Sequence, residues 1–173
     1  MCKPRAAASG DCPEGFFRMK SVARRDSGRH QQYLGLQHKA EPSGRFQIVT
    51  QDAAVILNLV AVPHHQNAVS MLVIPQGPTL YMSVPCDQPA VDLWHSQDGS
   101  GRQIWVASRT HEGQGWQLSV SGGHHDGQGR HTLSCGLDAG QNHVDLWTRQ
   151  TWIMEEASSD MSRRMLGSHM DCS

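Results

Sequence analysis

An aspartate and a tryptophan recur two residues apart in this 173-residue chain, in two copies of the phrase Val-Asp-Leu-Trp. The first copy contains Asp92 and Trp94, the second contains Asp145 and Trp147, and each leads to a Gln-x-Trp motif. On a β-strand, residues i and i+2 project from one face, so each aspartate would share a face with its tryptophan. A flat aromatic ring matches the C–H face of a pyranose, and a carboxylate accepts hydrogen bonds from its hydroxyls. Each pair therefore predicts a sugar-binding site.

Packing is the alternative role for the two tryptophans. Trp94 and Trp147 would then lie beneath a neighbouring loop or in a subunit interface, where tryptophan is also common. The sequence leaves both roles open, and the second role would imply a homodimer.

The strands that would carry these pairs belong to three similar stretches of chain. Residues 70–108 and 116–154 share one order: a strand, a turn, a second strand, Val-Asp-Leu-Trp, a loop and Gln-x-Trp. The first stretch lacks the motifs but keeps the order, with strands expected at 15–22, 32–37, 46–52 and 55–62. Units of about 40–50 residues with four strands also build propellers, but four blades are the usual minimum. The sequence therefore predicts an all-β fold, a β-trefoil with three pseudo-repeats of four short strands.

Alternation along the repeated strands indicates which side chains form the core. Leu93 and Leu146 would face inward with the valines two residues before them, which turns both Asp–Trp pairs outward. Trp105 and Trp152, which end the Gln-x-Trp motifs, would fill the core. The glutamine of each motif would bond loop backbone that would otherwise be unpaired.

The length favours one domain with loose ends. We expect the domain over 13–158, a flexible N-terminal tail at 1–12 and a flexible C-terminal tail at 159–173. Within the domain, the apolar run 53–63 predicts a buried strand, and 152–164 is expected to form a short terminal helix.

Composition and charge exclude several kinds of partner. The formal net charge is −1 and no basic face stands out, so we expect no nucleic acid partner. No apolar run reaches the roughly 18 residues of a membrane helix, so we expect no membrane insertion. The first residues lack the apolar core of a secretory signal, which predicts a cytoplasmic protein or one released without a classical signal peptide. Five cysteines, three of them in the expected tails, predict reduced thiols.

The repeats resemble a known family. The segments YLGL, YMSV and TLSC, followed by V-x-L-W and Q-x-W, are similar to the repeat unit of ricin-B-type β-trefoils, also called QxW lectin domains. The strand GFFRMKSV is similar to the first strand of fungal ricin-B-like lectins. The resemblance covers about residues 13–155. It implies a lectin whose partners are glycans of the galactose or N-acetylgalactosamine type, bound at shallow sites that gain by avidity.

The resemblance also implies site positions. The aromatic platforms fall on Trp94 and Trp147, and the polar position before Gln-x-Trp falls on Arg102 and Arg149, where the family often has Asn. The residues expected to contact sugar are Ser83, Asp87, Asp92, Trp94, Arg102 and Gln103 in one site, and Ser134, Asp138, Asn142, His143, Asp145, Trp147 and Arg149 in the other.

One position departs from the family pattern. The aspartate that takes sugar hydroxyls in the family falls on Gly35, Ser83 and Ser134 in the three repeats, which puts the usual galactose preference in doubt. Asp87 and Asp138, in the turns that follow, would replace it by a different route.

The first repeat is expected to have no ordinary site. Ile48 and Val49 stand near the platform position, where the other repeats have tryptophan.

The sequence also contains features that bear on protein binding, metal binding and catalysis. A protein-binding trefoil, of the protease-inhibitor or actin-binding type, would use loops, and 61–67 and 122–130 are the candidates. Three roles are open for the histidine-rich stretch 124–131: a weak metal site, a pH sensor, or a solvated turn. Of these we do not expect the metal site. The chain has no G-x-S-x-G or H-E-x-x-H motif, so we expect no enzyme activity and no cofactor.

Overall fold

The structure, a computed structural model, describes residues 12–22, 32–38, 42–73, 79–110, 113–122, 129–136, 141–147 and 149–157. These residues form twelve strands: β1 (Gly15–Ser21), β2 (Tyr33–Leu36), β3 (Phe46–Val49), β4 (Leu57–Ala61), β5 (Ala68–Val73), β6 (Leu80–Ser83), β7 (Asp92–Trp94), β8 (Trp105–Arg109), β9 (Trp116–Val120), β10 (Thr132–Cys135), β11 (Val144–Trp147) and β12 (Trp152–Glu156). Their one helix is the 3₁₀ turn η1 (Gln51–Ala53), which confirms the predicted all-β class. In this part of the chain, no helix has the length and apolar character to cross a membrane.

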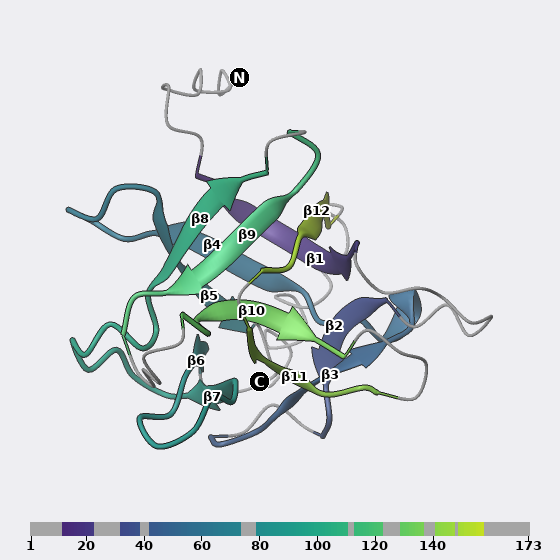
Figure 1. Cartoon of the computed structure of the whole chain (residues 1–173), viewed down its shortest axis with the longest axis horizontal. Helices are drawn as coiled ribbons and strands as arrows, with labels where there is room; N and C mark the ends of the chain where they lie inside the picture. Colours follow the sequence, from purple (N-terminus) through teal and green to yellow (C-terminus); the bar gives the residue numbers. More distant parts are fainter. Residues whose placement is uncertain are drawn as a thin grey trace, which may run out of the picture.

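Six of the strands close into a barrel. β1 pairs with β4 and β12, β5 pairs with β4 and β8, and β9 pairs with β8 and β12, all antiparallel. Each barrel strand therefore has a neighbour on both sides. In Figure 1 these six strands make up the upper part of the molecule.

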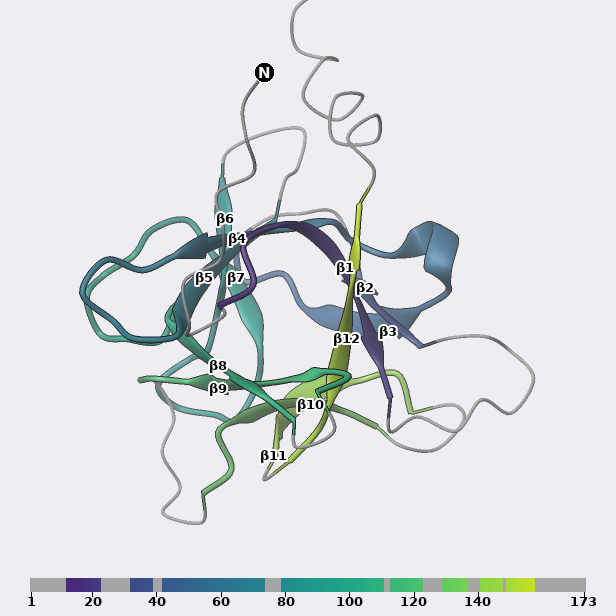
Figure 2. The same cartoon turned by 90° about the horizontal axis from the view of Figure 1, so that it is seen from above.

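Three hairpins are attached to the barrel. β2 pairs with β3, β6 with β7, and β10 with β11, and their first strands pair with β1, β5 and β9. The chain thus repeats a unit of four strands three times. Figure 2 shows the strands gathered in three groups around a centre. A barrel of six strands with three hairpins is the arrangement of the predicted β-trefoil.

The strand register fixes which residues of the three repeats are equivalent. Within the hairpins, one position of the first strand faces one position of the second, in the pairs Gly35–Gln47, Ser83–Asp92 and Ser134–Asp145. Two residues further along the second strand, the equivalent positions are Val49, Trp94 and Trp147.

Isolated bridges join the hairpins to one another, in the pairs Arg45–Asp92, Ala90–Asp145 and Gln47–His143. Each bridge joins the aspartate position of one repeat to the residue two places before that position in the neighbouring repeat. The aspartate position of every repeat therefore lies where two hairpins meet.

The core contains the tryptophans of both Gln-x-Trp motifs. Trp105 and Trp152 are fully buried, as predicted. The indole Nε1 of Trp105 donates to the Met82 carbonyl at 3.1 Å, and that of Trp152 donates to the Leu133 carbonyl at 2.9 Å. Each ring thus ties the start of β8 or β12 to a hairpin, because its polar atom needs a partner when buried.

The two glutamines of these motifs behave differently. Gln150 accepts a hydrogen bond from the Cys135 amide and donates to the Cys135 carbonyl at 3.4 Å, so its partner is backbone as predicted, but backbone at the end of β10 rather than in a loop. Gln103 instead donates to the Ser83 hydroxyl at 3.3 Å, so the prediction of a backbone partner is wrong there. The partner of Gln103 is thus a side chain, whereas the partner of Gln150 is the backbone.

Two local predictions are also wrong. The strand expected over 53–63 is limited to Leu57–Ala61, because η1 occupies Gln51–Ala53 before it and a turn at Pro63 and His64 comes after it. The terminal helix expected within 152–164 is the strand β12 over Trp152–Glu156, which pairs with β1 along five residues. Pairing in a closed barrel overrides the helix preference of the glutamates. Residues from 158 onward lie outside the described residues, and so do most of the expected tails.

Candidate functional site

A pocket of about 310 Å³ opens on the third repeat. It is lined by Ser134, Cys135, Gly136, Gln141, His143, Asp145, Trp147, Arg149 and Gln150. The residues come from β10, β11 and the segments that follow them. The structure therefore brings together five of the residues predicted for this site: Ser134, His143, Asp145, Trp147 and Arg149.

Trp147 forms one wall of this pocket. Its side chain is 51% exposed, the largest exposed aromatic ring in the described residues. It ends β11, where alternation turns it away from the buried Leu146. The Arg130 guanidinium lies 5.3 Å from the ring centroid, a cation–π contact on the indole. The ring remains half-exposed beside this contact, so it still offers surface to a ligand.

Asp145 lies two residues earlier on the same face. It is half-buried, and this burial raises the pKa of its carboxyl, while the neighbouring His143 acts in the opposite direction. His143 Nε2 and Asp145 Oδ2 are 3.5 Å apart. Across the hairpin, the Ser134 hydroxyl donates to the Thr132 carbonyl at 2.9 Å. A carboxylate, a hydroxyl and an imidazole thus converge beside an indole ring.

Gly136 shapes the base of the pocket. A Cβ atom added there would lie 2.5 Å from the Gln141 Cβ and 3.0 Å from the His143 Cε1. Only glycine lets the end of β10 approach the segment before β11 this closely. Arg149 also lines the pocket and is exposed.

Of the other two residues predicted for this site, only one is placed by the structure, and it does not line the pocket. Asn142 is half-buried, and its backbone carbonyl accepts a hydrogen bond from the Ile48 amide at 2.9 Å, so it joins repeats instead. Asp138 lies outside the described residues.

The corresponding surface of the second repeat is covered. Trp94 is half-buried, with the Arg102 guanidinium 5.2 Å from its ring centroid and the His95 ring 4.8 Å away. Arg102 therefore occupies the space over the indole. Asp87, also predicted for this site, is exposed in the turn between β6 and β7.

Asp92 is buried, which corrects the prediction that both Asp–Trp pairs face outward. It is 8% exposed, and its Oδ1 has no hydrogen-bond partner among the described residues. A backbone bridge to Arg45 places the hairpin of the first repeat beside it. Burial raises the pKa of Asp92 to about 6, against the opposing effects of Arg45, Arg102 and Ser83. The alternation along β7 predicts which face Asp92 occupies, but it carries no information about the hairpin of another repeat that lies beside that face.

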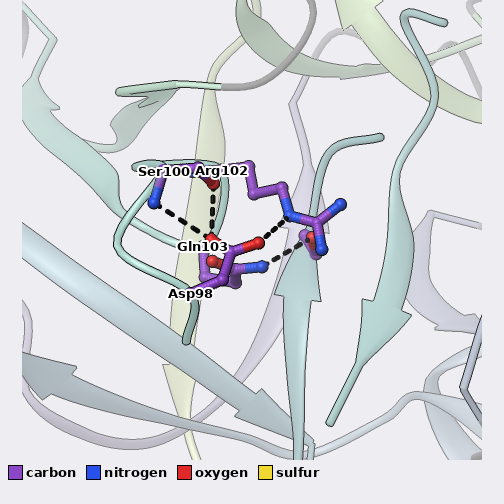
Figure 3. Close-up of polar contacts among 5 residues, drawn as sticks. Asp98, Ser100, Arg102 and Gln103 are labelled. Atoms are coloured by element: carbon purple, nitrogen blue, oxygen red, sulfur yellow. Dashed lines mark hydrogen bonds and ion pairs between the residues drawn. The ribbon is translucent and has the colours of Figure 1, made fainter. Parts of the chain in front are cut away.

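Arg102 is held by the loop from which it comes (Figure 3). Its Nε donates to Asp98 Oδ2 at 2.8 Å, and Asp98 Oδ1 accepts from the Ser100 amide and hydroxyl at 3.0 and 2.5 Å. Gln103 lies against the same cluster and reaches Asp98 and Arg102 if its amide is rotated by 180°. The side chains of the loop thus bond mainly to one another.

In the first repeat, the position equivalent to the pocket serine is packed against a side chain of the neighbouring strand. Gly35 stands where the other repeats have serine, and a Cβ added to it would meet the Val49 Cγ2 at 2.5 Å. Val49, at the platform position, therefore fills the space above Gly35. That no ordinary site exists in this repeat stays a prediction.

Sequence reasoning missed Asp98 and Arg45 beside Trp94, and Gln141 and Gly136 in the pocket. A signal for Asp98 was present: nine positions separate Trp94 from Gln103, against three between Trp147 and Gln150. The longer spacing predicts a longer loop over the second repeat. Arg45 had no such signal, because it comes from another repeat.

The part of the chain that the structure describes contains no candidate metal site. No group of three histidine, cysteine, aspartate or glutamate side chains gathers there. Most of the histidine-rich stretch, including His124, His125 and Asp126, lies outside the described residues. No disulfide joins the described cysteines Cys12, Cys86 and Cys135 to one another.

Solved structures share this fold. A Culex quiquefasciatus salivary protein of the Cysteine and Tryptophan-Rich family aligns with a TM-score of 0.59 and 14% identity, over 86% of this chain and 98% of that one. The Polyporus squamosus lectin bound to the human-type influenza-binding epitope Neu5Acα2-6Galβ1-4GlcNAc aligns with a TM-score of 0.57 and 14% identity, over 83% of this chain and 49% of the lectin. The BEL β-trefoil aligns with a TM-score of 0.56 and 14% identity, over 85% of this chain and 97% of that one.

The chain thus has a β-trefoil fold. No protein-family model matches the chain, and no curated protein sequence matches it. At 14% identity, these likenesses show the fold and leave the function to the site itself.

Proposed function

We propose that the protein is a carbohydrate-binding lectin of the ricin-B type, and that its main glycan site is the pocket of the third repeat. One observation carries the proposal: the half-exposed Trp147 ring stands beside the half-buried Asp145 carboxylate in an open pocket of about 310 Å³. We propose the pocket of the third repeat as a binding site rather than a catalytic one.

The chemistry of the pocket suits a pyranose. The indole of Trp147 offers a flat apolar surface to the C–H face of the sugar. Asp145 accepts hydrogen bonds from sugar hydroxyls, and such bonds to a charged acceptor are the stronger kind. Ser134, His143 and Arg149 provide further polar groups around the same space. A galactose or N-acetylgalactosamine unit is the first ligand to test.

The fold neighbours support the same class. The Polyporus squamosus lectin, a solved structure of similar fold, carries a bound glycan epitope. The repeated Val-Asp-Leu-Trp and Gln-x-Trp motifs of this chain support the ricin-B type.

A glycan array tests the proposal. We expect the protein to bind at least one class of glycan, and Trp147→Ala to weaken that binding by about tenfold or more. Asp145→Asn should weaken it too, because the amide is a poorer acceptor. Trp94→Ala is the matched comparison and should have a much smaller effect, since Arg102 already covers that ring. Absence of glycan binding, or full binding by Trp147→Ala, would contradict the proposal.

A protein-binding role is the second candidate, and one observation favours it. The turn at 61–67 is largely exposed, with His64 and Asn67 at φ values of 65° and 55°. A pocket of about 190 Å³ lies at its base, lined by Val60, Ala61, Val62, Pro63, Ser70, Leu72, Tyr81 and Gln97. Capture of a protein partner that is lost when 63–66 is replaced by a short glycine turn would support this role. The other predicted loop, 122–130, lies mostly outside the described residues.

A further inference from the structure

We infer that the second repeat contains a closed sugar site, that Arg102 covers it, and that Asp98 holds Arg102 in place. Arg102 then acts as a cover rather than as a sugar ligand, and Asp98 is a positioning residue. The inference rests on the proposed function, because the ligand would be the same hydroxyl-rich sugar that the third repeat binds.

The residues beneath Arg102 match those of the open pocket. Trp94, Asp92 and Ser83 occupy the positions of Trp147, Asp145 and Ser134 in the third repeat. Asp92 is nine-tenths buried, and its Oδ1 has no hydrogen-bond partner among the described residues. A buried acceptor without a partner is costly, and a sugar hydroxyl would supply the missing donor.

Arg102 closes the space in which a sugar would stack. Its guanidinium lies 5.2 Å from the Trp94 centroid, and its side chain is only 17% exposed. The matching arginine of the third repeat, Arg149, is exposed at the edge of its pocket. Another arginine, Arg130, lies 5.3 Å from the Trp147 centroid but leaves that ring 51% exposed, whereas Trp94 under Arg102 is half-buried.

Asp98 is placed to hold Arg102 by the loop between β7 and β8. The Ser100 amide and hydroxyl fix Asp98 Oδ1, which leaves Oδ2 for the Arg102 Nε at 2.8 Å (Figure 3). The loop also packs on the segment after β9, where a Cβ added to Gly122 would lie 2.1 Å from the Ser100 carbonyl oxygen. Glycine at 122 thus permits the close approach that anchors the loop.

The cover can be displaced. Exposed ion pairs contribute little to stability, because solvent screens them and the side chains lose rotamer freedom. Both partners here touch solvent, with side-chain exposures of 17% and 36%. A ligand that satisfies Asp92 and stacks on Trp94 would therefore compete with Arg102.

The test removes the third site and then releases Arg102. In the Trp147→Ala background, Asp98→Asn keeps an oxygen for Ser100 but replaces the acceptor of the Arg102 Nε, and Arg102→Ala removes the cover itself. We expect both to raise galactose affinity at the second repeat by about two- to fivefold, because an exposed ion pair contributes at most about 1 kcal/mol. Asp52→Asn, at an exposed aspartate bonded to Thr50 in η1, is the matched control and should change nothing.

A readout without sugar separates this inference from the proposed function. In the same background Trp94 is the most exposed tryptophan among the described residues, since Trp105, Trp116 and Trp152 are buried. Acrylamide quenching of its fluorescence should rise in Asp98→Asn and not in Asp52→Asn. Unchanged quenching would overturn the role of Asp98.

Weaker galactose binding in Arg102→Ala, with otherwise wild-type sequence, would show Arg102 to be a ligand. Increased quenching in a protein that binds no glycan in any form would refute the proposed function and leave the role of Asp98 standing.

Discussion

The second and third repeats carry the same four-residue phrase and present it in opposite ways. Trp147 is half-exposed beside an open pocket, whereas Trp94 lies under Arg102. The strands are equivalent, so the difference comes from the connections. Ten residues link β7 to β8, and four link β11 to β12. The Val-Asp-Leu-Trp motif determines where the tryptophan lies on the fold, and the length of the following loop determines whether a ligand can reach it.

The neighbouring hairpin adds a second difference. Asp92 faces Arg45 of the first repeat, while Asp145 faces Ala90 of the second. The bridged neighbour of Asp92 has a long cationic side chain, and the bridged neighbour of Asp145 has only a methyl group. Identical motifs in a repeat protein thus acquire different surroundings from neighbours that do not carry the motif.

The largest expected effect lies in the core, where the two repeats should behave alike. Trp105→Ala and Trp152→Ala should each lower the free energy of unfolding by about 3–5 kcal/mol, because each removes a fully buried ring and leaves a carbonyl unpaired. Urea denaturation measures this. Trp105→Phe and Trp152→Phe provide milder variants if the alanine forms do not fold. A cost for one tryptophan several times that of the other would show that the repeats differ inside as well as outside.

The second prediction concerns the two aspartates and pH. The folded-state pKa of Asp92, about 6, lies above the unfolded value of about 3.9, so the folded state binds the proton more tightly. Its contribution to stability is therefore complete below about pH 4 and is lost as the pH rises through 6. Between pH 4 and pH 7 the free energy of unfolding of the wild type should fall by about 2–3 kcal/mol more than that of Asp92→Asn.

Asp145→Asn is the matched variant for this measurement. Burial raises the pKa of Asp145 as well, but its side chain is 37% exposed, so the pH-dependent difference should be smaller. Equal differences for the two variants in urea titrations at pH 4 and 7 would contradict the contrast in burial.

The smallest of these effects distinguishes the two glutamines. Gln150→Ala leaves the amide and carbonyl of Cys135 without their side-chain partner and should cost about 1–2 kcal/mol. Gln103→Ala should cost less, because its partner is the Ser83 hydroxyl, which can turn toward Asp92. Thermal denaturation of the two variants in parallel checks the order. A reversed order would mean that Gln103 supports the loop more than its contacts indicate.

The periodic part of the fold was predictable from sequence. Alternation in Val-Asp-Leu-Trp and the repeat spacing identified the hairpin strands, and the buried Trp105 and Trp152 followed from the same pattern. These properties depend on residues close together in the chain. The strand β12 was mistaken for a helix because only its pairing with β1, far away in sequence, makes it a strand.

The candidate site was predictable in composition but not in accessibility. Ser134, Asp145 and Trp147 line the open pocket because strand register alone brings them together. Burial of Asp92 depends on Arg45, which no local pattern connects to it. The cover over Trp94 depends on how the Asp98 side chain turns within its loop, which spacing indicates only as extra length.

The meeting of β1 and β12 has a consequence for the order of the chain. Phe17 pairs with Glu156, and the Ala157 amide donates to the Phe16 carbonyl at 2.9 Å, so the first and last strands run side by side. A short peptide could join them, and the chain could be opened instead in the exposed turn at 63–66. Such a circular permutant would keep every strand pairing of the barrel and would begin with the second repeat. The β-trefoil is in this sense a closed circle, and the place where the polypeptide starts is separable from the contacts that hold it together.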